Sequence, residues 1–188
     1  LPHNLQAWGD LCEFITIARR SAPKGQYQVV WPDTGWARLQ GCEVLLMLPY
    51  AISLEAACAI SISARGLFGT DLWLGVAQLL RADDALHLHK LQQISSLTGV
   101  PLVACGEVLM HLRSRKPLQD VVTAVRLRQP VSNCGFALQP NAENHLRSRQ
   151  RLAQIYPPAL LANTLVVASR CQFSLDELRY QYPQEAVL

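Results

Sequence analysis

The chain has 188 residues, of which half are hydrophobic and 16% are charged, and its formal net charge is +3. This composition is typical of a globular protein and excludes a disordered chain. At this length the chain can hold one sizeable core or parts of two domains. The small net charge does not indicate a nucleic-acid partner, so the local placement of arginine matters more.

The cysteines and the apolar stretches exclude two other classes of protein. No two of the six cysteines lie at Cys-x-x-Cys spacing, which argues against a zinc ribbon and favours a reducing, cytoplasmic setting. The longest apolar region, 44–62, is interrupted by Pro49 and Glu55, so it predicts a strand and a helix rather than a membrane span. No signal-peptide pattern opens the chain, and its start at Leu1 instead of methionine indicates processing or a fragment.

The first third of the chain predicts two helices and two strands. Residues 5–20 predict a helix whose buried face holds Leu11, Phe14, Ile15 and Ala18. The β-branched and aromatic content of 27–31 predicts a short strand, and the apolar run 43–48 predicts a strand buried on both faces. Residues 53–64 predict a helix that Ser53 caps and that Gly66 follows.

The middle of the chain continues this alternation. Residues 71–77 and 100–105 predict strands, and between them a helix runs from Asp83 or Asp84 to Gly99, with an apolar face of Leu88, Leu91, Ile94 and Leu97. His87 and His89 lie two residues apart on this helix, which points them to nearly opposite sides, and we expect both at the surface. Strands that alternate with helices predict the α/β class with parallel strands.

The last third predicts mostly helices, so a second structural unit can begin at Pro117. Pro117 suits the first turn of a helix whose core stripe would hold Leu118, Val121, Val122 and Val125. Residues 133–141 predict a loop, after which Asn141 can cap a helix that Pro157 and Pro158 interrupt. A further helix ends near Arg170, and Ser174 and Glu177 have the spacing of a capping box.

An acid and an imidazole follow the predicted strand 100–105, at the place where α/β proteins usually carry their chemistry. Glu107 and His111 could bind a divalent metal or act as acid and base. Two groups do not make a hydrolytic metal centre, which needs three or more ligands. A pair of ordinary polar residues is therefore the alternative interpretation.

Basic residues gather in two places. Arg113, Arg115 and Lys116 precede one predicted helix, and Arg147, Arg149 and Arg151 lie in another. Such clusters could contact DNA phosphates, or they could form a solvated face. No aromatic residues that would stack on bases are interleaved with them. The glycines form no phosphate-binding loop, and no nucleophilic-serine motif is present.

Several long stretches of the sequence resemble one family. They are 103–111, 113–120, 134–143, 145–149, 156–161, 173–180 and, near the start, 9–13, 18–20 and 23–25. These stretches resemble the polymerase and histidinol-phosphatase (PHP) domain of bacterial C-family DNA polymerases, and most closely the error-prone branch. The resemblance spans nearly the whole chain, although 31–81 matches only loosely.

The resemblance implies a fold and a set of partners. Residues 1–130 would form the C-terminal part of a distorted PHP-type (β/α) barrel, and 131–188 a helical connection toward a polymerase palm that this chain lacks. The palm would use magnesium, whereas no cofactor is expected for this segment. The partners implied are DNA, through the parent polymerase, together with a sliding clamp and damage-tolerance accessory proteins, and no membrane. The segment alone would be inactive.

One departure from the family pattern concerns the metal site. The family has Gly-Asp-Val-His-Met-His where this chain has Gly-Glu-Val-Leu-Met-His, so Glu107 and Leu109 stand at ligand positions. Leucine cannot bind a metal, which leaves Glu107 and His111 as residual candidates in a degenerate site. The favoured hypothesis is a structural segment of an error-prone, translesion DNA-directed DNA polymerase. The alternatives are a metal-dependent phosphoesterase and a truncated, non-catalytic scaffold.

Overall fold

A computed structural model of the chain describes residues 1–32 and 35–179. Within it, the strands β1 (Val44–Leu46), β2 (Leu72–Ala77) and β3 (Leu102–Cys105) form one parallel sheet in the order β1-β2-β3. The predicted α/β class is therefore confirmed. The three strands do not by themselves close a barrel, so the barrel remains a prediction.

Each pair of neighbouring strands is joined by a crossover helix. Helix α2 (Leu54–Phe68) leads from β1 to β2, and helix α3 (Asp84–Thr98) leads from β2 to β3. Helix α2 begins at the predicted cap, because the Ser53 hydroxyl accepts a hydrogen bond from the amide of Ala56. It continues past Gly66 and ends only where Gly69 adopts a positive φ of 57°.

Helix α3 ends at Gly99 as predicted, but two of its side chains lie on the opposite side from the prediction. His87 is buried, because its ring stacks on Tyr50 from the loop after β1. Leu97 is exposed, because the buried face turns away from it after Ile94. Asp83 occupies the N-cap position of α3 but makes no side-chain cap bond.

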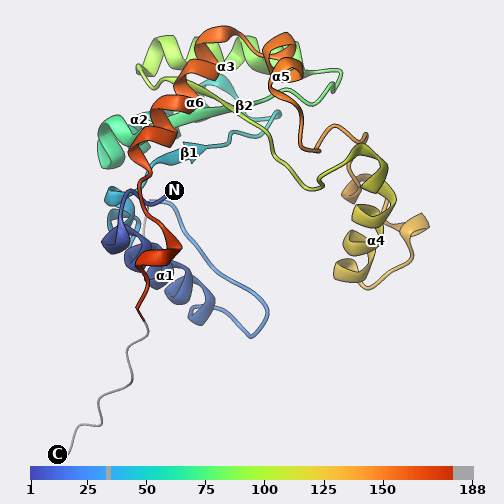
Figure 1. Cartoon of the computed structure of the whole chain (residues 1–188), viewed down its shortest axis with the longest axis horizontal. Coiled ribbons are helices and arrows are strands. Elements are labelled where there is room, and N and C mark those ends of the chain that lie inside the picture. Colours follow the sequence, from blue (N-terminus) through green and yellow to red (C-terminus); the bar gives the residue numbers. More distant parts are fainter. Residues whose placement is uncertain (33–34, 180–188) are drawn as a thin grey trace, which may run out of the picture.

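Both faces of the sheet are covered, which is why every residue of β2 is buried. Side chains alternate between the faces. Leu74 belongs to the main core with α2 and α3, whereas Trp73 and Val103 pack with Val167 of helix α6 (Pro158–Arg170). Helix α6, which ends where predicted, lies across β3 and is held there by a bond from the Asn163 amide to the carbonyl of Leu102 (Figure 1).

Helix α1 (Leu5–Arg20) has the predicted bounds and begins at Asn4, whose side chain accepts a hydrogen bond from the amide of Ala7. Its predicted buried face is correct for Leu11, Phe14 and Ala18 and wrong for Ile15, which is half exposed because no neighbouring element reaches that side. The short 3₁₀ helix Trp36–Gly41 packs against α1.

The predicted strand at 27–31 is wrong, and β1 is shorter than predicted and only half buried. The prediction of a strand rested on the β-branched and aromatic content of 27–31, but in the structure the aromatic ring of Trp31 serves side-chain packing. The ring of Trp31 lies 5.1 Å from that of Trp36 and 6.3 Å from that of Phe68, so the aromatic side chain at the end of this segment packs against other rings.

Helix α4 (Lys116–Leu127) projects from the rest of the molecule on two extended segments (Figure 1). Pro117 lies in its first turn, as predicted. The predicted core stripe is wrong, because its side chains are 48–71% exposed: Leu118, Val121, Val122 and Val125. The apolar periodicity is real, but no long helix or strand of the described chain covers that face.

The polar segment before α6 also differs from the prediction. Helix α5 (Arg149–Ile155) begins at Ser148, whose hydroxyl accepts from the amide of Arg151, and not at Asn141. The Asn141 amide group instead donates to the carbonyl of Leu79, 2.7 Å away. The capping box of Ser174 and Glu177 is confirmed, on a single 3₁₀ turn. The end of the predicted helical connection, 180–188, lies outside the described residues.

Two leucines on α3 test the observed core. Leu91 is fully buried and Leu97 is 67% exposed. We expect Leu91→Ala to lower the free energy of unfolding by about 2–5 kcal/mol, because it removes buried methyl groups and leaves a cavity. Leu97→Ala should change it by no more than about 0.5 kcal/mol. Urea unfolding monitored by circular dichroism measures both, and equal losses would contradict this packing.

Candidate functional site

The carboxyl edge of the sheet brings together the loops that follow the three strands. The loop after β3 carries Glu107, which has a positive φ of 43°. One carboxylate oxygen of Glu107 lies 3.7 Å from the guanidinium of Arg81, which follows β2. The backbone carbonyl of Glu107 accepts a hydrogen bond from the Asn144 side chain. Glu107 is therefore an exposed carboxylate with its own cationic partner.

The remaining residues of the candidate metal motif do not join Glu107. The amides of Leu109 and Met110 both donate to the backbone carbonyl of Asn144, which holds this loop in place. The exposed His111 lines a cavity of about 230 Å³ beside Leu118 of α4, and Glu107 does not line that cavity.

The residues at this edge do not fit a divalent metal centre. Leu109 offers no ligand atom, and Glu107 faces an arginine. Among the described residues, the one group of three potential ligands within 4.8 Å of one another is His3, Glu43 and Asp71. Glu43 and Asp71 directly precede β1 and β2, so that group lies at the opposite, amino edge of the sheet.

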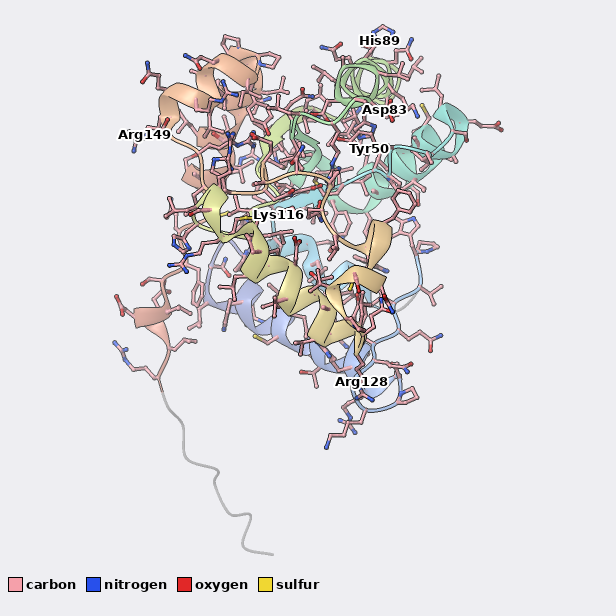
Figure 2. The ribbon with its side chains drawn as sticks, turned by 90° about the vertical axis from the view of Figure 1, so that its right-hand side faces the viewer. Tyr50, Asp83, His89, Lys116, Arg128 and Arg149 are labelled. Atoms are coloured by element: carbon pink, nitrogen blue, oxygen red, sulfur yellow. The ribbon has the colours of Figure 1, made fainter. Side chains whose placement is uncertain are left out.

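A second set of polar groups at the carboxyl edge was not predicted from the sequence. The buried carboxylate of Asp84 accepts bonds from the amides of Leu79 (2.7 Å) and Arg81 (3.2 Å) and from the hydroxyl of Tyr50 (2.7 Å). Burial and the bond to Asp84 raise the pKa of Tyr50 to about 12. Tyr50 and Asp83 lie beside the first turn of α3 (Figure 2). These contacts fix the loops after β1 and β2.

His87 belongs to this set. Its ring stacks on Tyr50 with centroids 4.0 Å apart, and its Nδ1 atom is buried with no hydrogen-bond partner in the described chain. Burial, and then the charge of Lys90, lower the pKa of His87. His89, two residues further along, is exposed as predicted.

Tyr156, which sequence reasoning also missed, joins the loops after β2 and β3. Its hydroxyl donates to the carbonyl of Cys105 (2.6 Å) and accepts from the amide of Gln78 (3.0 Å). Arg147 donates to the same hydroxyl (3.1 Å) and to the carbonyl of Gln78 (2.7 Å). Arg147, a DNA-contact candidate, therefore bridges backbone and side-chain groups inside the fold.

The structure does not bring the six basic candidates to one surface. Arg113 is paired with the buried carboxylate of Glu143, and Lys116 with Asp120. Figure 2 shows Lys116, at the start of α4, and Arg149, at the start of α5, in different parts of the molecule. Within the described residues, three of the six candidates are exposed and have no ion pair: Arg115, Arg149 and Arg151.

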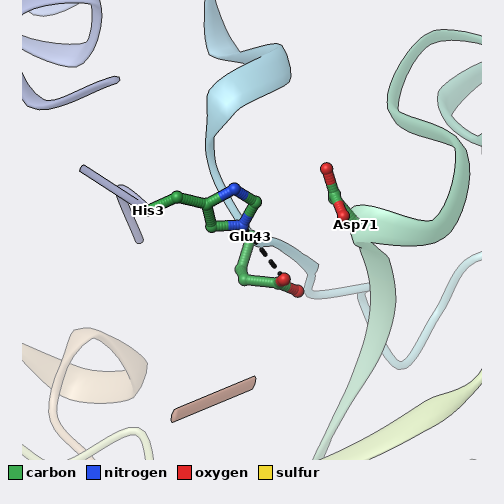
Figure 3. A group of neighbouring side chains, drawn as sticks. All are labelled: His3, Glu43 and Asp71. Atoms are coloured by element: carbon green, nitrogen blue, oxygen red, sulfur yellow. Dashed lines mark hydrogen bonds and ion pairs between the residues drawn. The ribbon is translucent and has the colours of Figure 1, made fainter. Parts of the chain in front are cut away.

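The amino edge holds a buried carboxylate. Glu43 is 1% exposed, and its Oε1 atom lies 3.0 Å from Nε2 of His3 (Figure 3) and 3.1 Å from Nη1 of Arg170. Its Oε2 atom accepts from the indole of Trp73. The same Nη1 atom of Arg170 is 3.4 Å from Asp71. A guanidinium group thus stands where a metal ion would have to bind.

Comparison with known proteins identifies relatives along the entire chain. Proteins named error-prone DNA polymerase are 43% identical over 97% of this chain in Methylococcus capsulatus, 44% over all of it in Pseudomonas aeruginosa, and 42% over all of it in Burkholderia mallei. The chain spans only 17–18% of the length of these relatives. No family model matches it.

No helix of the described residues is long and apolar enough to cross a membrane.

The buried ion pair at the amino edge predicts a stability change. Arg170→Gln should lower the free energy of unfolding by about 3 kcal/mol, because it removes the guanidinium partner of the buried carboxylate of Glu43. Adding Glu43→Gln should restore part of this loss, whereas the exposed control Arg20→Gln should have little effect. Urea unfolding of the four variants of the cycle measures the coupling. Additive losses would show that the guanidinium does not neutralise Glu43.

The buried imidazole predicts a dependence on pH. Since the pKa of His87 is lowered from 6.5 in the folded state, the unfolded chain binds its proton more readily. The stability that His87 contributes is therefore present above about pH 6.5 and falls as the pH decreases below that value. Urea unfolding at several values between about pH 5 and 7.5 gives the slope of the free energy of unfolding against pH. This slope should be smaller for His87→Asn and unchanged for His89→Asn. A slope that survives in His87→Asn would refute the assignment.

Proposed function

Since this chain is related along its whole length to proteins named error-prone DNA polymerase, we propose that it is a segment of a translesion DNA-directed DNA polymerase, a nucleotidyltransferase of the bacterial C family. The observation that carries this proposal is 42–44% identity over 97–100% of the chain. Because the chain spans less than a fifth of those relatives, the palm and its magnesium ions would lie in the rest of the polypeptide. The segment alone is then inactive.

The role we propose for this segment is structural, as a PHP-type domain whose metal site is degenerate. Three features of the carboxyl edge support it. Leu109 occupies a ligand position of the family motif, Glu107 faces Arg81, and Tyr156 holds the loops after β2 and β3 together. These contacts stabilise the carboxyl edge itself, and they engage the polar side chains that a metal-dependent hydrolysis would need.

Helix α4 supports a role in bracing another part of the enzyme. Its exposed apolar stripe is long enough to form one side of a helix interface, and a stripe of this kind on a soluble protein usually marks a contact surface. We propose that the rest of the polymerase polypeptide covers it. Contacts with a sliding clamp and with damage-tolerance accessory proteins remain part of the proposal through the family resemblance.

DNA contact by this segment is proposed for the basic residues that the fold leaves unpaired. Arg149 and Arg151 lie in the first turn of α5 and are exposed. Arg115 precedes α4 and is exposed as well. Arg113, Lys116 and Arg147 have partners within the chain, so we assign them a structural role.

Charge reversal tests DNA contact by the unpaired arginines of α5. Arg149→Glu with Arg151→Glu in the full polymerase should weaken DNA binding and lower the slope of log affinity against log salt by about 2, since each lost phosphate contact removes about one unit. Arg20→Glu, on the exposed end of α1, is the matched control. Fluorescence anisotropy with labelled DNA at several salt concentrations measures the slope. An unchanged slope would leave both arginines as surface charge.

A manganese titration tests the degenerate site against the phosphoesterase alternative. We expect no stoichiometric binding of Mn²⁺ at the carboxyl edge, and no difference between the unchanged chain and Glu107→Ala in isothermal titration calorimetry. Hydrolysis by a metal-bound water needs an occupied centre. One equivalent of metal that is lost in Glu107→Ala would favour the phosphoesterase.

The polymerase assignment has its own test. The DNA downstream of the segment that encodes this chain should encode a palm with paired aspartates. A short, complete reading frame would overturn the assignment for this product, and the truncated scaffold would then be the better hypothesis.

A further inference from the structure

A cavity of about 380 Å³ lies at the amino edge of the sheet, on the opposite side from Glu107. It is formed where the turn Gly69–Asp71 enters β2 and the turn 99–101 enters β3. The ends of α2 and α6 close its sides and supply one arginine each, Arg65 and Arg170. Both charged residues of its lining are thus cationic.

Arg65 is held in place but is not neutralised. Its Nη1 atom donates to the carbonyl of Thr98, the last residue of α3. The guanidinium lies so close to Gly99 that a Cβ atom there would be 2.1 Å from Nη1, and Gly99 also has a positive φ of 68°. No acidic partner of Arg65 is found among residues 1–32 and 35–179. The bond from Nη1 to Thr98 is the one hydrogen bond of this guanidinium in the described chain, so most of its five N–H donors are available to a ligand.

Arg170 presents its guanidinium to the same cavity with one nitrogen engaged. Nη1 makes its contacts to Glu43, to Asp71 and to the carbonyl of Thr70, which leaves the donors of Nη2 and Nε free of assigned bonds in the described chain. Its guanidinium carbon lies 5.7 Å from the centre of the Trp73 ring. Glu43 and Asp71 thus neutralise Arg170, which leaves Arg65 as the one cation of the cavity lining that has no acidic partner among the described residues.

The remaining wall is both polar and apolar. The hydroxyl of Thr70 has no hydrogen-bond partner among the described residues, so it is a further donor. Trp73, Val100 and Pro101 supply an apolar surface next to it. The volume lies within the range of about 300–1,000 Å³ that is typical of small-molecule sites.

We propose that this cavity binds a phosphate ester, with the phosphoryl group between Arg65, Arg170 and Thr70 and the organic group against Trp73 and Pro101. Planar guanidinium groups bind phosphoryl oxygens through paired, charge-assisted hydrogen bonds. Arg65 is fixed before binding, so little conformational entropy is lost when the anion arrives. The ester could be a free mononucleotide or the terminal phosphate of a DNA strand, and these share the same chemistry.

Nuclear magnetic resonance of the full ¹⁵N-labelled chain tests the proposal with four probes. These are inorganic phosphate, thymidine 5′-monophosphate, a short single-stranded DNA with a 5′-phosphate, and the same DNA without it. We expect shifts of the Thr70 and Gly99 amides and of the Trp73 indole, and not of the amides at the carboxyl edge. Absence of shifts with every probe at millimolar concentration would overturn the proposal.

Substitutions then assign the binding to Arg65. Arg65→Gln should weaken binding about tenfold, as expected for the loss of a charge-assisted hydrogen bond. The matched control Arg126→Gln, on α4, should bind as the unchanged chain does. Arg65→Lys keeps the charge and should lie between the two, which provides a second measurement if Arg65→Gln does not fold. Equal affinities of Arg65→Gln and Arg126→Gln would refute the site.

The comparison between probes identifies the source of the phosphate. Tighter binding of the 5′-phosphorylated DNA than of the mononucleotide and of the unphosphorylated DNA indicates a strand terminus. Binding of the mononucleotide that is as tight as that of the phosphorylated DNA indicates a free ester. Binding of the unphosphorylated DNA alone would contradict the proposal, because that strand offers only internal phosphodiesters and neither a mononucleotide nor a terminal phosphate.

Discussion

The fold depends on the burial of one carboxylate. A charge in the interior is stable only with partners close by, and Glu43 takes its partners from positions 3, 73 and 170 of the chain. Three segments that are far apart in sequence must therefore meet at the start of β1. Their meeting sets the direction of α6 across the sheet and the orientation of the Arg170 guanidinium. The proposed anion site is linked to this arrangement, because Glu43, together with Asp71 and the carbonyl of Thr70, holds the Nη1 atom of Arg170 at the cavity.

Much of the fold could be predicted from periodicity, because α1, β2, α3 and α6 each carry a pattern that their surroundings satisfy. The pattern on α4 is just as regular, yet the prediction of a core stripe was wrong. Periodicity reports that a helix has an apolar face, but it does not report whether the same chain covers that face. The prediction that His87 lies at the surface was wrong for a related reason. The ring of Tyr50, which buries it, comes from a loop 37 positions earlier in the sequence.

The candidate site was predictable only in part. Leu109 is visible in the sequence once it is set beside the family motif, and the proposal of a degenerate metal site rests on that residue. The contacts that organise the carboxyl edge of the sheet are not visible in the sequence. Tyr156 contacts backbone groups of Gln78 and Cys105, and Asn144 contacts that of Glu107. Bonds to backbone atoms leave no pattern in side-chain identity, so no motif could point to them.

The amino edge also determines how the segment is attached to whatever surrounds it. The amide of Gln172 donates to the carbonyl of His3, and the rings of Trp8 and Phe173 stack 5.0 Å apart. The first residues and the residues after α6 thus run side by side, and the chain enters and leaves the sheet at one place (Figure 1). In a longer polypeptide, a body tethered at one place can pivot without pulling its neighbours apart. Only a second contact, such as one on the apolar face of α4, would stop that rotation.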